Sequence, residues 1–213
     1  MKYAVPEAVL KVCMALRDAG FEAYLVGGCV RDLLLAREPK DWDITTNATP
    51  EQIQALFIET FYENDFGTVG VVTESEDPRL KVVEVTPYRT EGEYSDARRP
   101  DSVAFSNSLS EDLKRRDFTI NAIAYDPLGD TLVDEHGGQD DLKRRIIAAV
   151  GDADERFRED ALRTLRAIRL AGELDFAIEA RTVAGIVANA AQLEKISRER
   201  VRDELLRVLE SPR

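Results

Sequence analysis

The stretch YLVGGCVRDLLLAREPKDWDITTNATP, residues 24–50, decides the fold of this chain. An apolar run over residues 21–26 predicts a strand, and Gly27-Gly28 ends it. Residues 30–35 predict the start of a helix, and residues 41–45 alternate polar and apolar side chains as a half-buried strand does. This close succession of strand, helix and strand predicts a domain that mixes both kinds of element.

Elements of both kinds also flank this stretch. Upstream, residues 9–16 carry apolar side chains at helical spacing, and Gly20 predicts the end of that helix. Downstream, residues 49–52 (Thr-Pro-Glu-Gln) form a capping box with proline at the first helical position, which opens a further helix. Residues 69–73 and 80–86 predict a pair of strands joined by a polar turn.

The remainder of the chain changes from mixed to helical character. Residues 89–102 are polar, with few apolar anchors, and predict a long loop. From residue 155 to residue 209 the apolar pattern predicts three helices, with Gly172 ending the first and Ser197 capping the third. We therefore expect a boundary near residue 150.

Composition and charge restrict the class of protein. Apolar residues make up 44% and charged residues 33% of the chain, as in soluble globular proteins, and no apolar run is long enough to cross a membrane. The first residues lack the features of a signal peptide, so Cys13 and Cys29 are expected to be buried thiols in a reducing cytoplasm. The net charge of −12 argues against broad, non-specific nucleic-acid binding. Any contact with RNA must use local clusters of basic residues.

Gly27 and Gly28 stand between the predicted strand and helix, and Arg31 follows in the first helical turn. Two glycines let backbone N–H groups approach an anion closely, and a helix N-terminus adds a partial positive charge. An arginine in this position can form two parallel hydrogen bonds to phosphate. A plain strand-to-helix turn explains the same residues equally well, so this motif alone leaves both interpretations open.

Asp41 and Asp43 are two residues apart on a predicted strand, so their side chains are expected on one face. Trp42 and Ile44 make the opposite face apolar, which orients both carboxylates. Two carboxylates so placed can bind two Mg²⁺ ions, whereas without a cation their like charges repel each other. The alternative is an exposed, solvated acidic strand end.

Glu84 is a lone acidic residue inside the apolar strand pattern of residues 82–86. An unpaired charge is unfavourable when buried, so the side chain faces either solvent or a bound metal. Taken alone, the pattern favours a Glu84 side chain that faces solvent.

The motifs and their order resemble the polymerase-beta nucleotidyltransferase superfamily. Within it they resemble the bacterial class II tRNA nucleotidyltransferases (CCA-adding enzymes) and poly(A) polymerases, over nearly the whole chain. The matching segments after residues 24–50 follow in the expected order: Phe66-Gly67-Thr68, Glu84-Val85-Thr86 with Arg89, Arg98-Arg99-Pro100, residues 115–122, Gly137-Gly138, Asp141-Leu142 and Glu159-Asp160-x-x-Arg163.

The resemblance implies an α+β fold. Residues 1–150 would form the nucleotidyltransferase head, a polymerase-beta-like palm with a small mixed sheet and helices. Residues 151–213 would form a helical neck that carries a nucleotide-recognition helix. Members of the family usually continue into body and tail domains that grip the tRNA acceptor stem, and we expect those domains to be absent from these 213 residues.

The resemblance also implies a role for each matching residue. Asp41 and Asp43 would be catalytic and bind the two Mg²⁺ ions. Glu84 would be a third metal ligand, or would help to deprotonate the attacking hydroxyl. The residues implied in nucleotide binding are Gly27, Gly28, Arg31, Arg116, Asp117, Asn121, Asp160, Arg163, Arg166 and Arg169. For Arg116 and its neighbour, the residues alone favour a solvated basic surface.

Four of these residues, from Asp160 to Arg169, recur every three positions, and on a helix such a row forms a slanting stripe. In the family, the acid and the first arginine resemble a protein template for the base. Asp160 can accept from the exocyclic amine that cytosine and adenine have and uracil lacks, and Arg163 can donate to acceptors of the base. A surface ladder of salt bridges is the alternative. A parallel apolar stripe is expected to anchor the helix: Leu162, Leu165 and Ile168.

The implied function is template-independent transfer of CMP or AMP, from CTP or ATP, to the 3′ end of an RNA, expected to be tRNA, by two-metal phosphoryl transfer. A poly(A) polymerase of the same family is a close alternative, because it shares this head. A non-catalytic nucleotide- or RNA-binding module is disfavoured because all three carboxylates are present. A metal phosphohydrolase is disfavoured because His136 is the single histidine. No membrane partner is expected.

Overall fold

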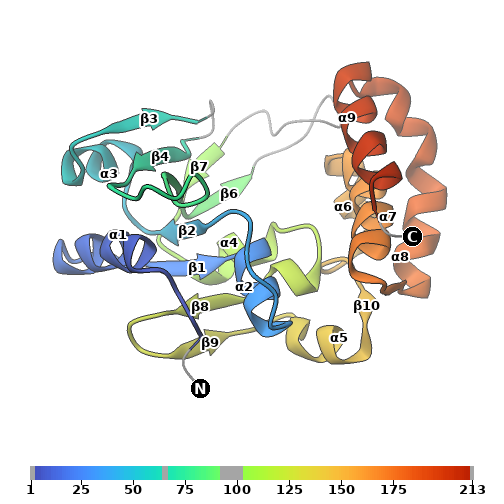
Figure 1. Ribbon diagram of the computed structural model, residues 1–213. Helices are drawn as coiled ribbons and strands as arrows, with labels where there is room; N and C mark the ends of the chain where they lie inside the picture. The colour runs from blue at the N-terminus through green and yellow to red at the C-terminus, as the bar shows by residue number, and fades with distance from the viewer. Residues whose placement is uncertain (1–2, 64–66, 92–102, 212–213) are drawn as a thin grey trace. The chain divides into compact units, whose positions relative to one another are not determined.

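The computed structural model describes residues 3–63, 67–91 and 103–211. Its contacts divide the chain into two compact units, and Figure 1 labels most of their helices and strands. Unit 1 consists of Met1–Thr90, Ala104–Leu113 and Asn121–Glu135, and unit 2 consists of Glu91–Val103, Lys114–Ile120 and His136–Arg213. The domain boundary expected near residue 150 stays a prediction. Among the described residues, no helix is both long enough and apolar enough to cross a membrane.

Unit 1 is built on a seven-stranded mixed sheet with the strand order β3-β4-β5-β2-β1-β8-β9 (Figure 1). Strands β2 and β5 run parallel, and the other neighbouring pairs are antiparallel. This mixed sheet with helices confirms the predicted α+β class. The strands are β1 (Tyr24–Val26), β2 (Asp43–Thr46), β3 (Thr60–Tyr62), β4 (Val69–Val72), β5 (Val82–Pro87), β8 (Ala124–Asp126) and β9 (Thr131–Val133).

Two of the helices of unit 1 carry the end signals that the sequence predicts, whereas α2 (Gly28–Leu34) begins two residues earlier than expected and α4 (Leu109–Lys114) was not predicted. Gly20 adopts a left-handed φ of +87° just after the end of the first helix, a conformation that glycine takes without strain. Thr49 accepts a hydrogen bond from the Gln52 amide, and the Gln52 side chain accepts one from the Thr49 amide, so the capping box is formed. Cys13 and Cys29 are buried free thiols, as expected. The helices are α1 (Glu7–Asp18), α2 (Gly28–Leu34), α3 (Pro50–Leu56) and α4 (Leu109–Lys114).

Some predicted boundaries were wrong. The second strand begins at Asp43, so Asp41 lies in the bend before it, although the Trp42 carbonyl still accepts the Glu84 amide at 3.2 Å. Part of the loop predicted over residues 89–102 is strand β6 (Arg89–Glu91), which pairs with β7 (Val103–Phe105). The rest of that loop, with Arg98-Arg99-Pro100, and also Phe66, lies outside the described residues.

Unit 2 contains four α-helices between residues 153 and 209, where the sequence predicts three. The first predicted helix is interrupted at Asp160, whose backbone is extended (φ −138°, ψ 105°). Gly172 lies inside a helix rather than ending one, because the end falls at Asp175, which itself adopts the left-handed conformation (φ +58°). The α-helices are α5 (Gly138–Arg144), α6 (Ala153–Glu159), α7 (Leu162–Leu174), α8 (Ala180–Asn189) and α9 (Arg198–Leu209), and β10 (Ile146–Ile147) pairs with β11 (Ala177–Ile178).

The buried face of α7 differs from the predicted apolar stripe. Leu162 and Leu165 are buried, but Ile168 is 41% exposed. A spacing of three residues drifts by about 60° per step around a helix, so the third member turns away from the core. Leu170 and Leu174 take its place on the buried face.

Candidate active site

The parallel pairing of β2 and β5 brings two of the predicted carboxylates together. Asp43 is the register partner of Glu84, so the two side chains lie on the same face of the sheet on neighbouring strands. Trp42 and Ile44 are buried on the opposite side of β2, as predicted. Glu84 is therefore beside Asp43 and does not simply face solvent.

On its other side, Glu84 has a glycine that is covered by an aromatic ring. Its register partner in β4 is Gly70, which has no side chain. A Cβ built at this glycine would come within 2.6 Å of the ring of Phe61, so that ring covers the glycine. Phe61 is 41% exposed and therefore forms an apolar wall on the carboxylate face.

The carboxylates repel one another in the absence of a cation. The pKa of Glu84 is raised to about 7, mainly by desolvation and then by the negative charges of Asp43, Glu63 and Asp41, in that order. Sequence reasoning missed Glu63, because this residue follows the short strand β3 and shows no motif of its own. The four carboxylates of Asp41, Asp43, Glu63 and Glu84 thus make one region of unit 1 strongly negative.

This region fits Mg²⁺, which the family resemblance implies. The described residues contain no group of three or more His, Cys, Asp or Glu side chains arranged to hold a metal by themselves. Mg²⁺, however, is usually bound by one or two carboxylates, with water and substrate phosphates completing its shell. Asp43 and Glu84 supply such a pair, and the raised pKa of Glu84 shows that a positive charge is favourable there.

The raised pKa of Glu84 predicts a pH-dependent stability. The folded chain holds this proton up to about pH 7, whereas an ordinary glutamate releases it near 4.5, so the stability conferred by the proton is lost as pH rises through this window. We expect Glu84→Gln to raise the free energy of unfolding at pH 8 by about 1–3 kcal/mol in metal-free buffer. The gain over wild type should vanish below about pH 5. Thermal melts from pH 5 to 8 measure this.

Glu59→Gln is the matched control for this prediction, because Glu59 is an exposed glutamate directly before β3. Its melting curve should follow wild type at every pH. If Glu84→Gln were no more stable than wild type at pH 8, burial and the neighbouring negative charges would not destabilise the ionised Glu84 carboxylate.

A second group in unit 1 surrounds Arg31. Its guanidinium donates to the carboxylate of Asp32 at 2.9 Å and to the side-chain oxygen of Asn121 at 3.0 Å. Gly27 precedes α2 with φ +80° and ψ −137°, a conformation open to glycine but strained for other residues. Three predicted nucleotide-binding positions, Gly27, Arg31 and Asn121, thus belong to one group, and Asp32 orients the arginine.

Two further predicted residues pair with each other in unit 2. Arg166 donates through two nitrogens to one oxygen of Asp117, at 2.8 and 2.6 Å. Asp117 also accepts from the Phe118 amide, and its negative charge raises the pKa of Arg166. Arg116 is half-buried beside them.

The row from Asp160 to Arg169 is held by ion pairs. Arg163 donates to Glu159 at 2.6 Å, and Arg169 donates to Glu173 and Glu204, each at 3.0 Å. Asp160 pairs with Arg200 of α9 at 3.2 Å. The predicted stripe is corrected in one respect: Asp160 precedes α7, so only the three arginines share that helix.

Sequence reasoning missed the partners of the predicted residues. Asp32 and Glu159 lie inside segments that carry the family resemblance, and Arg200 lies in the expected neck, but their contacts depend on the fold. For Glu159 alone, its position four residues before Arg163 was a usable signal, since such pairs meet on a helix. The Asp160–Arg200 contact had no such signal.

The comparisons with known proteins agree with this geometry. Residues 23–148 match the family described as the poly(A) polymerase head domain, and residues 175–213 match the family described as a probable RNA and SrmB-binding site of polymerase A. The CCA-adding enzyme of Geobacillus kaustophilus is 49% identical over 207 residues, which cover 97% of this chain and 50% of that protein. The CCA-adding enzyme of Geobacillus stearothermophilus is 49% identical over 213 residues, covering 100% of this chain and 51% of that protein.

Solved structures of CCA-adding enzymes also match this chain. A crystal structure of the Bacillus stearothermophilus CCA-adding enzyme in complex with CTP matches 98% of this chain and 50% of its own, with a TM-score of 0.87 and 44% identity. The Thermotoga maritima CCA-adding enzyme complexed with tRNA matches with a TM-score of 0.78 and 27% identity, over 98% of this chain and 49% of its own. This chain thus spans about half the length of the curated relatives that it matches. It belongs to the poly(A) polymerase head-domain family and is a relative of the bacterial CCA-adding enzymes.

Proposed function

We propose that this chain is the catalytic part of an RNA nucleotidyltransferase that transfers CMP or AMP from CTP or ATP to the 3′ end of a tRNA. The observation that carries the proposal is the pairing of Asp43 with Glu84 on adjacent strands. Support comes from relatives that are CCA-adding enzymes, including one in complex with CTP. Residues 1–150 are proposed as the head and residues 151–213 as the neck.

The reacting end of the nucleotide is assigned to unit 1. Asp41, Asp43 and Glu84 would hold two Mg²⁺ ions. When bound, these ions neutralise charge on the triphosphate and make the RNA 3′-hydroxyl easier to deprotonate. Arg31 would donate to phosphate oxygens, supported by Asp32 and Asn121, and the two glycines would let the triphosphate approach the backbone.

The chemical step joins the 3′-oxygen of the RNA to the α-phosphorus of the nucleotide. The bond between that phosphorus and the bridging oxygen breaks, and pyrophosphate leaves. The hydroxyl proton passes to Glu84 or to solvent. The pKa of about 7 belongs to Glu84 without a cation, and a bound Mg²⁺ would lower it, so Glu84 accepts this proton only if it is not itself a metal ligand.

Choice of the base is assigned to unit 2. Asp160 would accept from the amine of cytosine or adenine, and Arg163 would donate to acceptors of the same base. Arg116, Asp117, Arg166 and Arg169 would contact the nucleotide or hold the residues that do. The support is the paired side chains of Asp117 and Arg166 and the clamped carboxylate of Asp160.

A poly(A) polymerase is the second candidate, favoured by the match of residues 23–148 to the poly(A) polymerase head domain. The two functions differ in product. A CCA-adding enzyme stops after completing the terminal triplet, whereas a poly(A) polymerase continues with ATP alone.

The experiment that tests the proposed function is incubation with each labelled nucleoside triphosphate, Mg²⁺ and tRNAs that end before or within the CCA sequence. We expect CTP and ATP to be incorporated, with release of pyrophosphate. Long tails from ATP alone would support the second candidate. Nucleotide binding without incorporation into any RNA would support a non-catalytic module.

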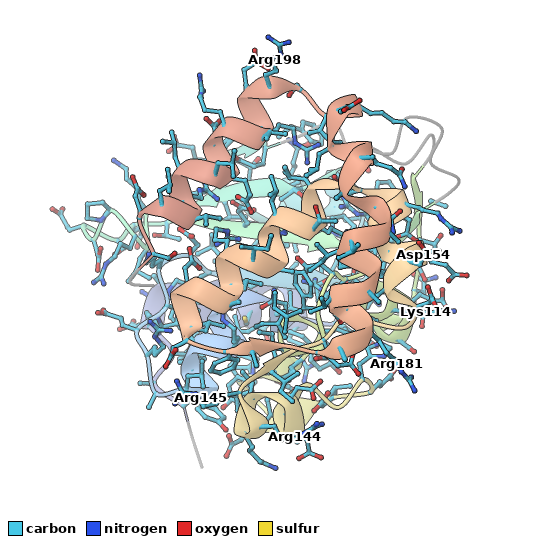
Figure 2. All side chains as sticks on the ribbon, turned by 90° about the vertical axis from the view of Figure 1, so that its right-hand side faces the viewer. Lys114, Arg144, Arg145, Asp154, Arg181 and Arg198 are labelled. Atoms are coloured by element: carbon cyan, nitrogen blue, oxygen red, sulfur yellow. The ribbon has the colours of Figure 1, made fainter. Side chains whose placement is uncertain are left out.

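The charge distribution predicts weak binding of tRNA by the 213-residue chain. The net charge is −12, and exposed basic residues are interleaved with acids, as the positions of Lys114, Arg181 and Asp154 illustrate (Figure 2). Arg145 pairs with Asp175 at 2.7 Å, which leaves it less free to bind phosphate. We expect a shallow decrease of tRNA affinity with salt, because the slope counts the phosphates contacted.

A salt titration of tRNA binding, beside a nucleotide-binding assay, checks this expectation. Retained nucleotide binding with weak tRNA binding is the expected result. Tight and steeply salt-dependent tRNA binding would show that this chain holds an extended phosphate-binding surface.

A further inference from the structure

Asp160 occupies an unusual position for a residue proposed to read a base. It lies between α6 and α7 with an extended backbone, so neither helix fixes the direction of its side chain. One carboxylate oxygen, Oδ1, accepts the amide of Leu162, the first residue of α7, at 3.0 Å. The other oxygen, Oδ2, needs a second contact if the plane of the carboxylate is to be fixed.

Arg200 supplies that contact. Its Nη2 donates to Oδ2 of Asp160 at 3.2 Å, and the pair is largely buried, with 33% of the arginine side chain and 17% of the aspartate side chain exposed. Its Nη1 is also buried and has no hydrogen-bond partner in the part of the chain that the structure describes. Among those residues, Asp160 is the one side chain that pairs with this guanidinium.

The helix that carries Arg200 is fixed to the segment that carries Asp160. Ile196, just before α9, is buried in one cluster with Ala161 and Leu165, and Val201 packs against the same cluster. Glu204, which is almost fully buried, accepts from Arg169 of α7 at 3.0 Å. The position of Arg200 relative to Asp160 is therefore set by packing and by the Arg169–Glu204 ion pair.

We propose that Arg200 is a positioning residue for base selection, which it controls by holding the Asp160 carboxylate. This inference rests on the proposed function of Asp160. A carboxylate discriminates an amine from a carbonyl only if its oxygen is held where the exocyclic group arrives. If the carboxylate can swing away, water can enter between it and the base. The free-energy penalty for binding a base that presents a carbonyl instead of an amine then falls. Arginine suits this task because its planar guanidinium presents donors in a rigid fork.

The test measures kcat and KM for CTP, ATP, UTP and GTP with wild type, Arg200→Ala, Arg200→Lys and Asp160→Ala. We expect Arg200→Ala to reduce the preference for CTP over UTP by roughly tenfold, the factor that 1.4 kcal/mol represents. Arg200→Lys should recover part of the preference, since it keeps the charge but not the fork. Arg202→Ala is the matched control, because this arginine of α9 is exposed and pairs with Asp203.

A double variant separates positioning from a merely structural effect. If Arg200 acts through Asp160, adding Arg200→Ala to Asp160→Ala should leave the nucleotide preference of the single Asp160 variant unchanged. A melting temperature for each variant, with nucleotide preference compared among the folded ones, excludes unfolding as the cause.

The outcomes distinguish this inference from the function on which it rests. If Asp160→Ala abolishes the preference and Arg200→Ala leaves it intact, the positioning role of Arg200 is wrong and the base reader stands. If Asp160→Ala leaves the preference intact, the base reader itself is wrong. If Arg200→Ala and Arg202→Ala lower the preference equally, the effect belongs to α9 as a whole and the inference is overturned.

Discussion

Replacement of Asp43 by alanine is expected to reduce the rate of nucleotide transfer by on the order of a thousandfold or more. Asp43 is the register partner of Glu84, so its loss leaves a single carboxylate at this point of the sheet. Without the pair, charge on the triphosphate is no longer neutralised in the transition state. Asp41→Ala is expected to act in the same direction. Single-turnover rates of CTP incorporation at saturating Mg²⁺ measure both effects.

The fold should survive this change. Asp43 is one of the charges that raise the pKa of Glu84, so removing it relieves repulsion, and the melting temperature of Asp43→Asn should equal or exceed that of wild type. Asp18→Ala, at an exposed aspartate that ends α1, is the matched control and should retain full activity. Near-normal turnover in Asp43→Ala would rule out the two-metal mechanism for this chain.

Replacement of Asp160 is expected to have the second-largest effect, on the choice of nucleotide rather than on triphosphate affinity. Wild type should use CTP and ATP and use UTP and GTP poorly. Asp160→Ala should erode this preference by about tenfold to a hundredfold, because a carboxylate that accepts from an exocyclic amine is lost. The measurement is kcat/KM for the four nucleotides, with dissociation constants measured separately.

Asp160→Asn refines this experiment. Asparagine keeps an oxygen that can accept the Leu162 amide, so this hydrogen bond at the start of α7 is retained while the charge is removed. Asp203→Ala, at an exposed aspartate of α9, is the matched control and should leave nucleotide choice unchanged. Equal use of all four nucleotides by the wild-type chain would exclude a templating role for Asp160 and Arg163.

The sequence by itself determined the fold class and the residue types of the site. The glycine turn, the capping box and the alternation around Asp43 are local signals, because each depends on residues that are neighbours along the chain. The orientation of Asp43 away from Trp42 and Ile44 followed from the same local rule. Family motifs added the order of the segments, which supported the relation to CCA-adding enzymes.

Element boundaries followed less well from the sequence. The pattern from residue 155 onward predicts a continuous helix through Asp160, yet the chain breaks there, and the extended Asp160 accepts the Leu162 amide with its side chain. Gly172 predicts a helix end, but α7 continues to Leu174, which is buried. A local hydrogen bond accompanies the break at Asp160, whereas burial accompanies the continuation past Gly172.

Only the tertiary structure decided which side chains meet. Asp43 pairs with Glu84 because β2 and β5 adjoin in parallel, and Arg31 reaches Asn121, 90 residues away, through the folding of unit 1. Arg200 reaches Asp160 across 40 residues because α9 packs on the segment that starts α7. Periodicity in a sequence reports which face of an element is buried, but not which other element covers it. Strand register and helix packing depend on the whole core, and these contacts give the candidate site its chemistry.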